Sequence, residues 1–214
     1  KGIIDNANFD DDDKLGKGKA MQDRLSNLVG IFDDDDLDFS KSRAEGDDLL
    51  GDAYEYLMRN FATQSGKSKG QFYTPSEVSQ VIAKIIGTGS ANRRSQKGYD
   101  PTCGSGSLLL KVADEAPSGV TIYGQEIDVA TRAMAKMNMV LHENEDAKIE
   151  REDTISEPQF TDNGKLKEFD FAVSNPQFST KAWSSGIKPE NDKNKRFDGF
   201  DIPPKKNGDY AFLL

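Results

Sequence analysis

The tetrapeptide Asn-Pro-Gln-Phe at residues 175–178, directly after the apolar run "FDFAVS", carries groups suited to chemistry on a planar, nitrogen-bearing substrate. The side-chain oxygen of Asn175 and the backbone carbonyl of Pro176 can each accept a hydrogen bond from one exocyclic amino group. Both bonds together would localise the nitrogen lone pair and make it a better nucleophile. Phe178 could stack on the ring for roughly 1 to 3 kcal/mol. The alternative is that Asn175 caps a strand and Phe178 belongs to the core, and the tetrapeptide alone favours this alternative.

A second group of candidate residues lies in "DPTCGSG", residues 100–106. Glycines at a turn from strand to helix let the backbone approach a ligand closely and expose the helix N-terminus, although such a turn is by itself more often plain turn chemistry. The stretch lacks the Gly-Lys-Ser/Thr of a phosphate-binding loop and the third glycine of a dinucleotide fingerprint. Glu126 follows about twenty residues later, where carboxylates hold ribose hydroxyls. Together, the two motifs indicate a site that binds a nucleoside and has no phosphate-binding loop.

An alternation of helices and strands must position these residues. "TPSEVSQVIAKIIG" predicts a helix with Thr74 as N-cap, Glu77 completing a capping box and Gly87 as the stop. Further helices are expected near residues 107–116 and 129–143. Strands are expected in "GVTIYGQEID", "AKIEREDTI" and "FDFAVSNP". A first strand should end near Asp100, and because Tyr99 is almost its only apolar residue, either this strand is short or its neighbourhood is disturbed. This order predicts an α/β fold with a mostly parallel sheet and helices on both of its faces, and such sheets bind ligands at the carboxyl ends of their strands.

The first quarter of the chain differs from the rest in charge. Residues 1–60 hold 16 Asp and Glu against 8 Lys and Arg, whereas residues 61–214 hold 21 against 20. The acidic runs at 10–13 and 33–36 are predicted to be solvated loops, the alternative being a surface that docks on a basic partner. Helices are expected in "KAMQDRLSNLVGIF" and "GDDLLGDAYEYLMRNFATQS". We predict a helical segment with acidic loops over 1–45 and a catalytic domain over 46–214.

Composition excludes several chemistries. With one cysteine, Cys103, and one histidine, His142, we expect no internal disulfide, no Cys/His zinc site, no Ser-His-Asp catalysis and no metal. The sequence shows neither a membrane span nor a signal peptide, so we expect a protein of the cell interior. Lysines outnumber acids over 179–206, where a polyanion would lie if the substrate were a base in a nucleic acid. Trp183, in this stretch, could equally serve local packing or contact DNA.

Four motifs in order, "GQFYTP", "DPTCGSGSLLL", "YGQEID" and "SNPQF", resemble the modification (methylation) subunit of type I restriction-modification systems, a family of adenine DNA methyltransferases. The resemblance covers most of the chain, since "GDYAFLL" and the helical lead-in also match. It implies a Rossmann-like fold that binds S-adenosylmethionine, after a helical N-terminal segment. It also implies that the C-terminal part of the family's chain is missing, so that the 214 residues form a fragment.

The resemblance implies a role for each motif. Phe72, Tyr73 and Thr74 would close over the methionine part of S-adenosylmethionine, Glu126 would hold the ribose, and Asp153 would sit near the adenine ring of the cofactor. The turn that would hold the amino-acid moiety comprises Asp100, Thr102, Gly104, Ser105 and Gly106. The catalytic residues would be Asn175, which also borders the cofactor, Pro176 and Phe178, around a target adenine swung out of the duplex.

One departure from the family pattern lies in the catalytic tetrapeptide. Gln177 replaces the second proline of Asn-Pro-Pro-Phe/Tyr, and this change should loosen the aim of the Pro176 carbonyl. We therefore expect Gln177 to affect turnover more than cofactor binding, and we expect little activity from the chain alone.

The spacing of the motifs bears on partners. About seventy residues separate the glycine turn from Asn175, too few for an inserted sequence-reading domain. The resemblance supplies the partners: DNA, a specificity subunit, a second modification subunit and, for cleavage, restriction subunits, in a bacterial or archaeal cytoplasm.

Two alternatives to DNA methylation stay open. An Asn-Pro-x-aromatic site also suits a glutamine side-chain amide, so the chain could be a protein glutamine methyltransferase. It could instead be a non-catalytic assembly subunit that keeps the cofactor site while Gln177 has weakened catalysis.

Overall fold

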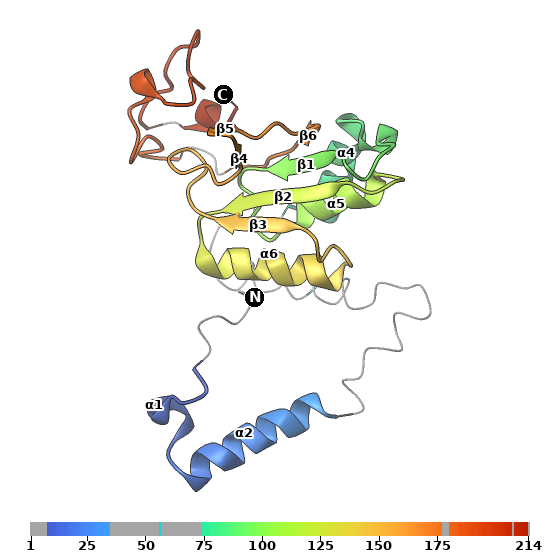
Figure 1. The fold of residues 1–214 in the computed structure, drawn as a ribbon, viewed down its shortest axis with the longest axis vertical. Coiled ribbons are helices and arrows are strands. Elements are labelled where there is room, and N and C mark those ends of the chain that lie inside the picture. The colour runs from blue at the N-terminus through green and yellow to red at the C-terminus, as the bar shows by residue number, and fades with distance from the viewer. Residues whose placement is uncertain (1–7, 35–55, 57–73, 177–179, 207, 214) are drawn as a thin grey trace. The chain divides into compact units, whose positions relative to one another are not determined.

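The computed structural model describes residues 8–34, 56, 74–176, 180–206 and 208–213 (Figure 1). Contacts divide the chain into two compact units, Lys1–Tyr56 and Leu57–Leu214. The predicted boundary at 45/46 and the helix expected in "GDDLLGDAYEYLMRNFATQS" fall almost wholly outside the described residues, so both stay predictions. No helix in the described part of the chain is long and apolar enough to cross a membrane.

The N-terminal unit contains α1 (Asp12–Leu15) and α2 (Lys19–Phe32). Helix α2 confirms the helix predicted there. The first acidic run is not simply a solvated loop, as was expected, because Asp11 is the N-cap of α1 and its Oδ1 accepts hydrogen bonds from the backbone N–H groups of Asp13 and Lys14. Acidic residues in a first helical turn also interact favourably with the helix dipole, so part of this run builds structure.

The C-terminal unit is built on a four-stranded parallel sheet of order β3-β2-β1-β6. Its strands, in chain order, are β1 (Lys97–Asp100), β2 (Thr121–Glu126), β3 (Lys148–Arg151) and β6 (Phe171–Ala172). The α-helices among its described residues are α4 (Ser76–Ile85), α5 (Ser107–Glu115) and α6 (Val129–Leu141). A short 3-10 turn, η4 (Thr88–Ser90), follows α4, and β4 (Thr161–Asp162) pairs with β5 (Lys165–Leu166) in an antiparallel hairpin.

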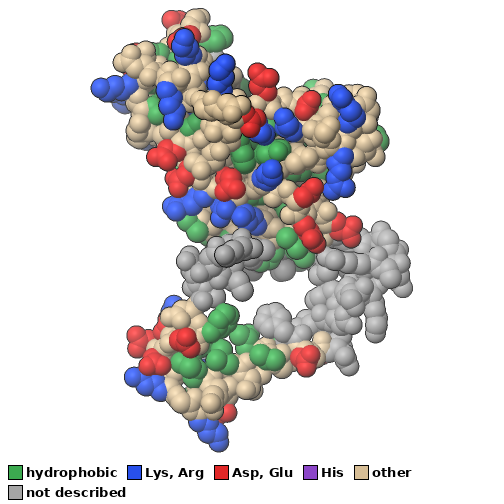
Figure 2. Space-filling view, viewed as in Figure 1, with side chains coloured by type: hydrophobic (Ala, Val, Ile, Leu, Met, Phe, Trp, Pro, Cys, Tyr) green, Lys and Arg blue, Asp and Glu red, His purple; other side chains and the backbone are tan. Residues whose placement is uncertain are grey.

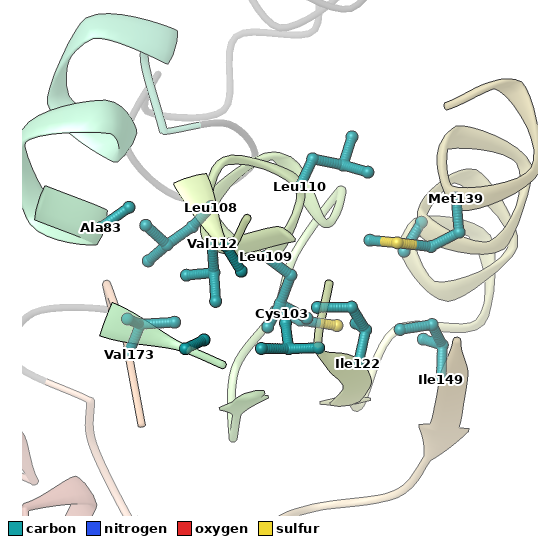
Figure 3. Packing of buried hydrophobic residues seen from close by; sticks show 14 residues of the cluster. Ala83, Cys103, Leu108, Leu109, Leu110, Val112, Ile122, Met139, Ile149 and Val173 are labelled. Carbon is teal, nitrogen blue, oxygen red and sulfur yellow. The ribbon is translucent and has the colours of Figure 1, made fainter. Parts of the chain in front are cut away.

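One hydrophobic core lies between the sheet and these three helices. Figure 3 shows Met139 of α6 and Leu109 of α5 close to Ile122 and Ile149 of the sheet, and Ala83 of α4 belongs to the same cluster. The opposite face carries Tyr123, whose ring meets the edge of Phe160 at 5.1 Å between centroids. The α/β class is confirmed, with one difference. Among the described residues, helices pack on one face and aromatic rings of the 160s cover the other.

Two local predictions have different outcomes. The capping box at the start of α4 is wrong, since Pro75 is the N-cap and no side chain caps the first turn. Gly87 does follow the last turn, with a φ of 78° that suits glycine. Strand β1 is short, which agrees with one of the two alternatives for it, and Gly98 explains its sparse apolar content. A Cβ there would lie 3.1 Å from Cγ1 of Val112, so the bare backbone lets α5 approach.

The chain after the fourth strand is mostly turns, with short 3-10 helices η5 (Pro189–Asn191) and η6 (Asp209–Phe212). A second small core holds it, formed by Ile155, Trp183, Phe197 and Ala211. Trp183 is 3% exposed and its Nε1 donates to the carbonyl of Pro204 at 3.0 Å. Trp183 therefore serves local packing. We call residues 180–213 the C-terminal segment.

Candidate functional site

A cavity of about 230 Å³ lies at the carboxyl ends of the strands. Its lining includes Thr102 after β1, Glu126 at the end of β2, Asp153 after β3 and Asn175 after β6. The rest of the lining is formed by Pro101, Gln125, Ile127, Glu152, Thr154, Thr180 and Phe212. Four predicted site residues, each at or after the end of a different strand, thus meet in one place, as is expected of a parallel sheet.

Glu126 is held at the cavity by backbone donors. Its Oε2 accepts from the N–H of Gly104 at 3.1 Å, and its Oε1 accepts from the N–H of Asp128 at 2.9 Å. Partial burial raises the pKa of this carboxyl above its usual value. A carboxylate offers about four lone-pair sites, so it can still accept two further hydrogen bonds from neighbouring hydroxyls.

Asp100 lies beneath the lining and not in it. Its side chain is 2% exposed, and Oδ1 accepts from the N–H of Thr102 at 2.9 Å. Burial is the main cause that raises the pKa of Asp100 to about 7, and the nearby charge of Glu126 contributes to the same shift. The hydroxyl of Thr102 lies 2.8 Å from that of Ser174, which ties the turn after β1 to the chain beside Asn175.

The glycine turn 104–106 is shaped by close packing against α6. Gly104 and Gly106 have φ of 55° and 83°, and a Cβ on Gly106 would lie 2.6 Å from Cε of Met139. Ser105 is buried, and its carbonyl accepts from Nδ2 of Asn138 at 3.1 Å. These three residues lie outside the described lining of the cavity, so their predicted contact with a ligand stays a prediction. What the structure shows is that Gly104 fixes Glu126.

Asp153 caps the loop that follows β3. Its Oδ1 accepts from the backbone N–H groups of Ile155 at 2.7 Å and Ser156 at 3.0 Å. Both bonds use the same oxygen, so Oδ2 is the atom that Asp153 can offer to a donor in the cavity. The hydroxyl of Thr154 donates to the carbonyl of Pro101, which joins this loop to the turn after β1.

Asn175 and Thr74, 101 positions apart, are joined by a hydrogen bond from Nδ2 to the threonine hydroxyl at 3.3 Å. The bond brings the end of "GQFYTP" to the Asn-Pro turn, and it leaves the amide oxygen of Asn175 as the acceptor for a substrate. Pro176 is half-buried beside it. Phe72, Tyr73, Gln177 and Phe178 lie outside the described residues, so their predicted roles stay predictions.

Residues 45–214, which are most of the chain, match the protein family described as N-6 DNA Methylase. The chain belongs to the N-6 DNA methylase family.

Individual relatives of the chain are methylase subunits of type I restriction-modification systems. The chain is 35% identical to the MpnII methylase subunit of a type I restriction enzyme from Mycoplasma pneumoniae, over 94% of the chain and 38% of that protein. It is 30% identical to a solved type I methyltransferase subunit from Streptococcus thermophilus, with a TM-score of 0.71 over 99% of the chain and 44% of that one. The chain thus spans about two fifths of these relatives. The resemblance to type I modification subunits is confirmed.

The fold is shared more widely. A class I S-adenosylmethionine-dependent methyltransferase from Listeria monocytogenes is 16% identical and superposes with a TM-score of 0.51, over 71% of this chain and 44% of that one. At this identity the likeness concerns the fold alone. The Rossmann-like methyltransferase fold predicted from the sequence is confirmed.

In this member of the N-6 DNA methylase family, seven of the eleven residues in the described lining were not predicted as site residues, and three of them are instructive. Gln125 is fully buried, and its Nε2 donates to the carbonyls of Glu152 and Glu157, each at 3.0 Å. A polar residue inside an apolar strand was the available signal. Thr180 and Phe212 reach the cavity from the C-terminal segment, and no local pattern marks them.

Proposed function

We propose that this chain carries the cofactor site and the target-base turn of an enzyme that transfers a methyl group from S-adenosylmethionine to the exocyclic amino nitrogen of an adenine in DNA. The observation that carries the proposal is the cavity that joins Glu126, Asp153 and Asn175 at adjacent strand ends. Membership in the N-6 DNA methylase family supports the same activity.

The residues present fit S-adenosylmethionine. Glu126 has spare acceptor capacity for the two ribose hydroxyls, and Oδ2 of Asp153 can accept from the amino group of the cofactor's adenine. Bound there, S-adenosylmethionine would supply a methyl group bonded to a positively charged sulfur. S-adenosylhomocysteine, which keeps that sulfur, is a good leaving group. The buried Asp100 adds negative potential beside the turn predicted to hold the amino-acid moiety.

Asn175 and Pro176 act on the target amino group. The amide oxygen of Asn175 and the carbonyl of Pro176 accept its two protons in hydrogen bonds, which concentrates the lone pair on nitrogen for in-line attack. The side chain of Asn175 is oriented for this by its bond to Thr74. Positioning of this kind can supply most of the rate of a direct transfer. The adenine must leave the base stack to reach the site.

DNA binding is supported by lysines on the C-terminal segment. Lys181, Lys205 and Lys206 border an open groove together with Ser184 and Ser185. The backbone N–H of Ala182 donates to the carbonyl of Lys205 at 2.9 Å. This bond joins the two stretches of chain that line the groove, near residues 181–185 and 205–206. Lys and Arg side chains project from this part of the surface in Figure 2. Ammonium groups there would neutralise phosphates that flank a flipped base.

Partners and setting follow from the relatives. We propose that the protein works in a bacterial or archaeal cytoplasm with a specificity subunit, a second modification subunit and a restriction subunit. Because the chain spans about two fifths of the relatives, we expect it to bind cofactor and to transfer little methyl without the remainder of such a complex. The relatives are DNA-modification subunits, which favours DNA over a glutamine amide and over a purely structural role.

The test uses radiolabelled S-adenosylmethionine with the full-length subunit assembled with its partners. Label in adenine of duplex DNA, lost when Asn175 is replaced by Ala, is the expected result. Label in protein would favour the glutamine alternative. Cofactor binding without transfer, restored by Gln177→Pro, would favour the non-catalytic assembly role, and either outcome would contradict the proposal.

A further inference from the structure

A buried ion pair lies in the C-terminal segment. Arg196 and Asp192 have side chains that are 13% and 4% exposed. Nε of Arg196 donates to Oδ2 of Asp192 at 2.9 Å, and Nη2 donates to Oδ1 at 2.8 Å, so the contact is bidentate. Such a fork holds the plane of the guanidinium group fixed and leaves its remaining donors pointing in defined directions.

The remaining donors of Arg196 reach the loop after β3. Nη2 donates to the carbonyl of Ile155 at 2.7 Å, and Nη1 donates to the carbonyl of Thr154 at 3.5 Å. The same loop is capped from its other end by Asp153, whose Oδ1 accepts from the N–H of Ile155. The backbone N–H groups of the loop thus bond to Asp153, and its carbonyls bond to Arg196. These bonds fix the backbone that carries the Asp153 carboxylate.

Packing joins the segment to this loop as well. The side chain of Ile155 belongs to the small core with Trp183 and Phe197, while Thr180 and Phe212 of the segment line the cavity itself. The chain that follows the Asn-Pro turn therefore returns to build one wall of the cofactor cavity. Glu126, by contrast, is held by the backbone N–H groups of Gly104 and Asp128.

We propose that Arg196, paired with Asp192, is a positioning residue that sets the Asp153 carboxylate for the cofactor's adenine. Through this contact, the segment that follows the target-base turn controls one end of the cofactor site. The inference rests on the proposed function, because it takes the cavity to be the S-adenosylmethionine site.

The experiment is a double-mutant cycle on the 214-residue chain, read by calorimetric binding of S-adenosylhomocysteine. Arg196→Lys keeps the charge that faces Asp192 but loses the fork that reaches two carbonyls. Asp153→Asn keeps Oδ1 as the loop acceptor and replaces Oδ2 by an amide. The matched control is Arg132→Lys. Arg132 also donates to a carbonyl of the third strand, that of Ile149 at 3.0 Å, yet lies outside the described lining of the cavity.

The expected result is that Arg196→Lys weakens binding about tenfold in the parent chain and less than about threefold when Asp153 is already Asn, because residues that act through one contact are not additive. Arg132→Lys should lower the melting temperature and leave the affinity unchanged. If Arg196→Lys does not fold, Asp192→Asn replaces it in the cycle.

Equal losses from Arg196→Lys in both backgrounds, or a lower melting temperature with unchanged affinity, would overturn the inference and show a merely structural role. Those outcomes leave the proposed function intact. A parent chain that binds no S-adenosylhomocysteine would contradict the proposed function itself, and the inference with it.

Discussion

The two halves of the cavity are built by different means. The cofactor half rests on the ends of β1 and β2, where backbone N–H groups fix Glu126 and Asp100 above a core shared by three helices. The target half is the Asn-Pro turn and the C-terminal segment, whose described residues include two short 3-10 helices. The same segment also contacts the loop of Asp153 in the cofactor half. The target half is held chiefly by Trp183 in the small core and by Arg196, which pairs locally with Asp192 and donates to the loop after β3.

This difference in construction implies that the cofactor half is the more rigid of the two and that the target half opens more easily. Strand ends and a shared core give a carboxylate a fixed position, which suits a cofactor of constant shape. A segment held by one small core and one ion pair opens at lower cost, as segments with few buried apolar contacts do. That property suits a site that must admit and release a base from a duplex. Four predictions test this contrast.

The largest effect is expected at the target half. In the assembled enzyme, Asn175→Ala should lower methyl transfer by on the order of 1000-fold, because it removes an acceptor that acts on the developing charge at nitrogen. Cofactor affinity should fall less than about tenfold. Single-turnover rates and calorimetric titrations measure the two effects. A large loss of affinity with unchanged transfer would place Asn175 in the cofactor half instead.

The second prediction concerns Asp100 in the cofactor half. Its folded pKa, about 7, lies above the ordinary value of 3.8, so the folded chain binds more protons than the unfolded chain between these values. Folding stability should therefore fall as pH rises from about 4 to 7. Asp100→Asn keeps the acceptor for Thr102 and removes the buried charge, which should raise stability at pH 8 by about 2 to 4 kcal/mol. Denaturant unfolding at pH 4 and pH 8 tests this, and equal effects at both pH values would contradict it.

A matched pair of glycines compares the halves directly. A Cβ on Gly124 would lie 2.9 Å from Sγ of Cys103, and one on Gly208 would lie 2.6 Å from Cβ of Trp183. Alanine at either position should cost about 1 to 3 kcal/mol by overpacking. Hydrogen exchange should quicken throughout the C-terminal unit for Gly124→Ala, but only in residues 180–213 for Gly208→Ala. Identical exchange patterns would show that the halves form one cooperative unit.

The smallest effect is expected from the lysine groove. Replacing Lys205 and Lys206 together by Gln should weaken binding of duplex DNA about tenfold, and should reduce the slope of log affinity against log salt by about 0.9 for each phosphate that the protein no longer neutralises. Replacing the exposed Lys84 and Lys165 by Gln is the control and should change neither quantity. A salt titration monitored by fluorescence anisotropy measures both. Equal effects of the two pairs would show that DNA binding does not use this groove.

The sequence predicts the cofactor half better than the target half for a physical reason. Apolar periodicity and glycines are local signals, and they predict the strands whose ends hold Glu126 and Asp153. The predicted capping box at Thr74 is wrong because Pro75 occupies the N-cap, where no side chain forms a capping hydrogen bond. Trp183, Arg196 and Phe212 act through partners tens of residues away, so no spacing pattern marks them.

The most direct measurement is a calorimetric titration of the chain with S-adenosylmethionine, beside a Glu126→Ala variant and a Glu126→Gln variant that keeps one acceptor oxygen. We expect one binding site per parent chain, weaker binding with Gln and no detectable binding with Ala. The melting temperatures of the unliganded variants verify that each is folded. Binding that is unchanged in both variants, or absent from the folded parent chain, would contradict the assignment of the cavity to the cofactor.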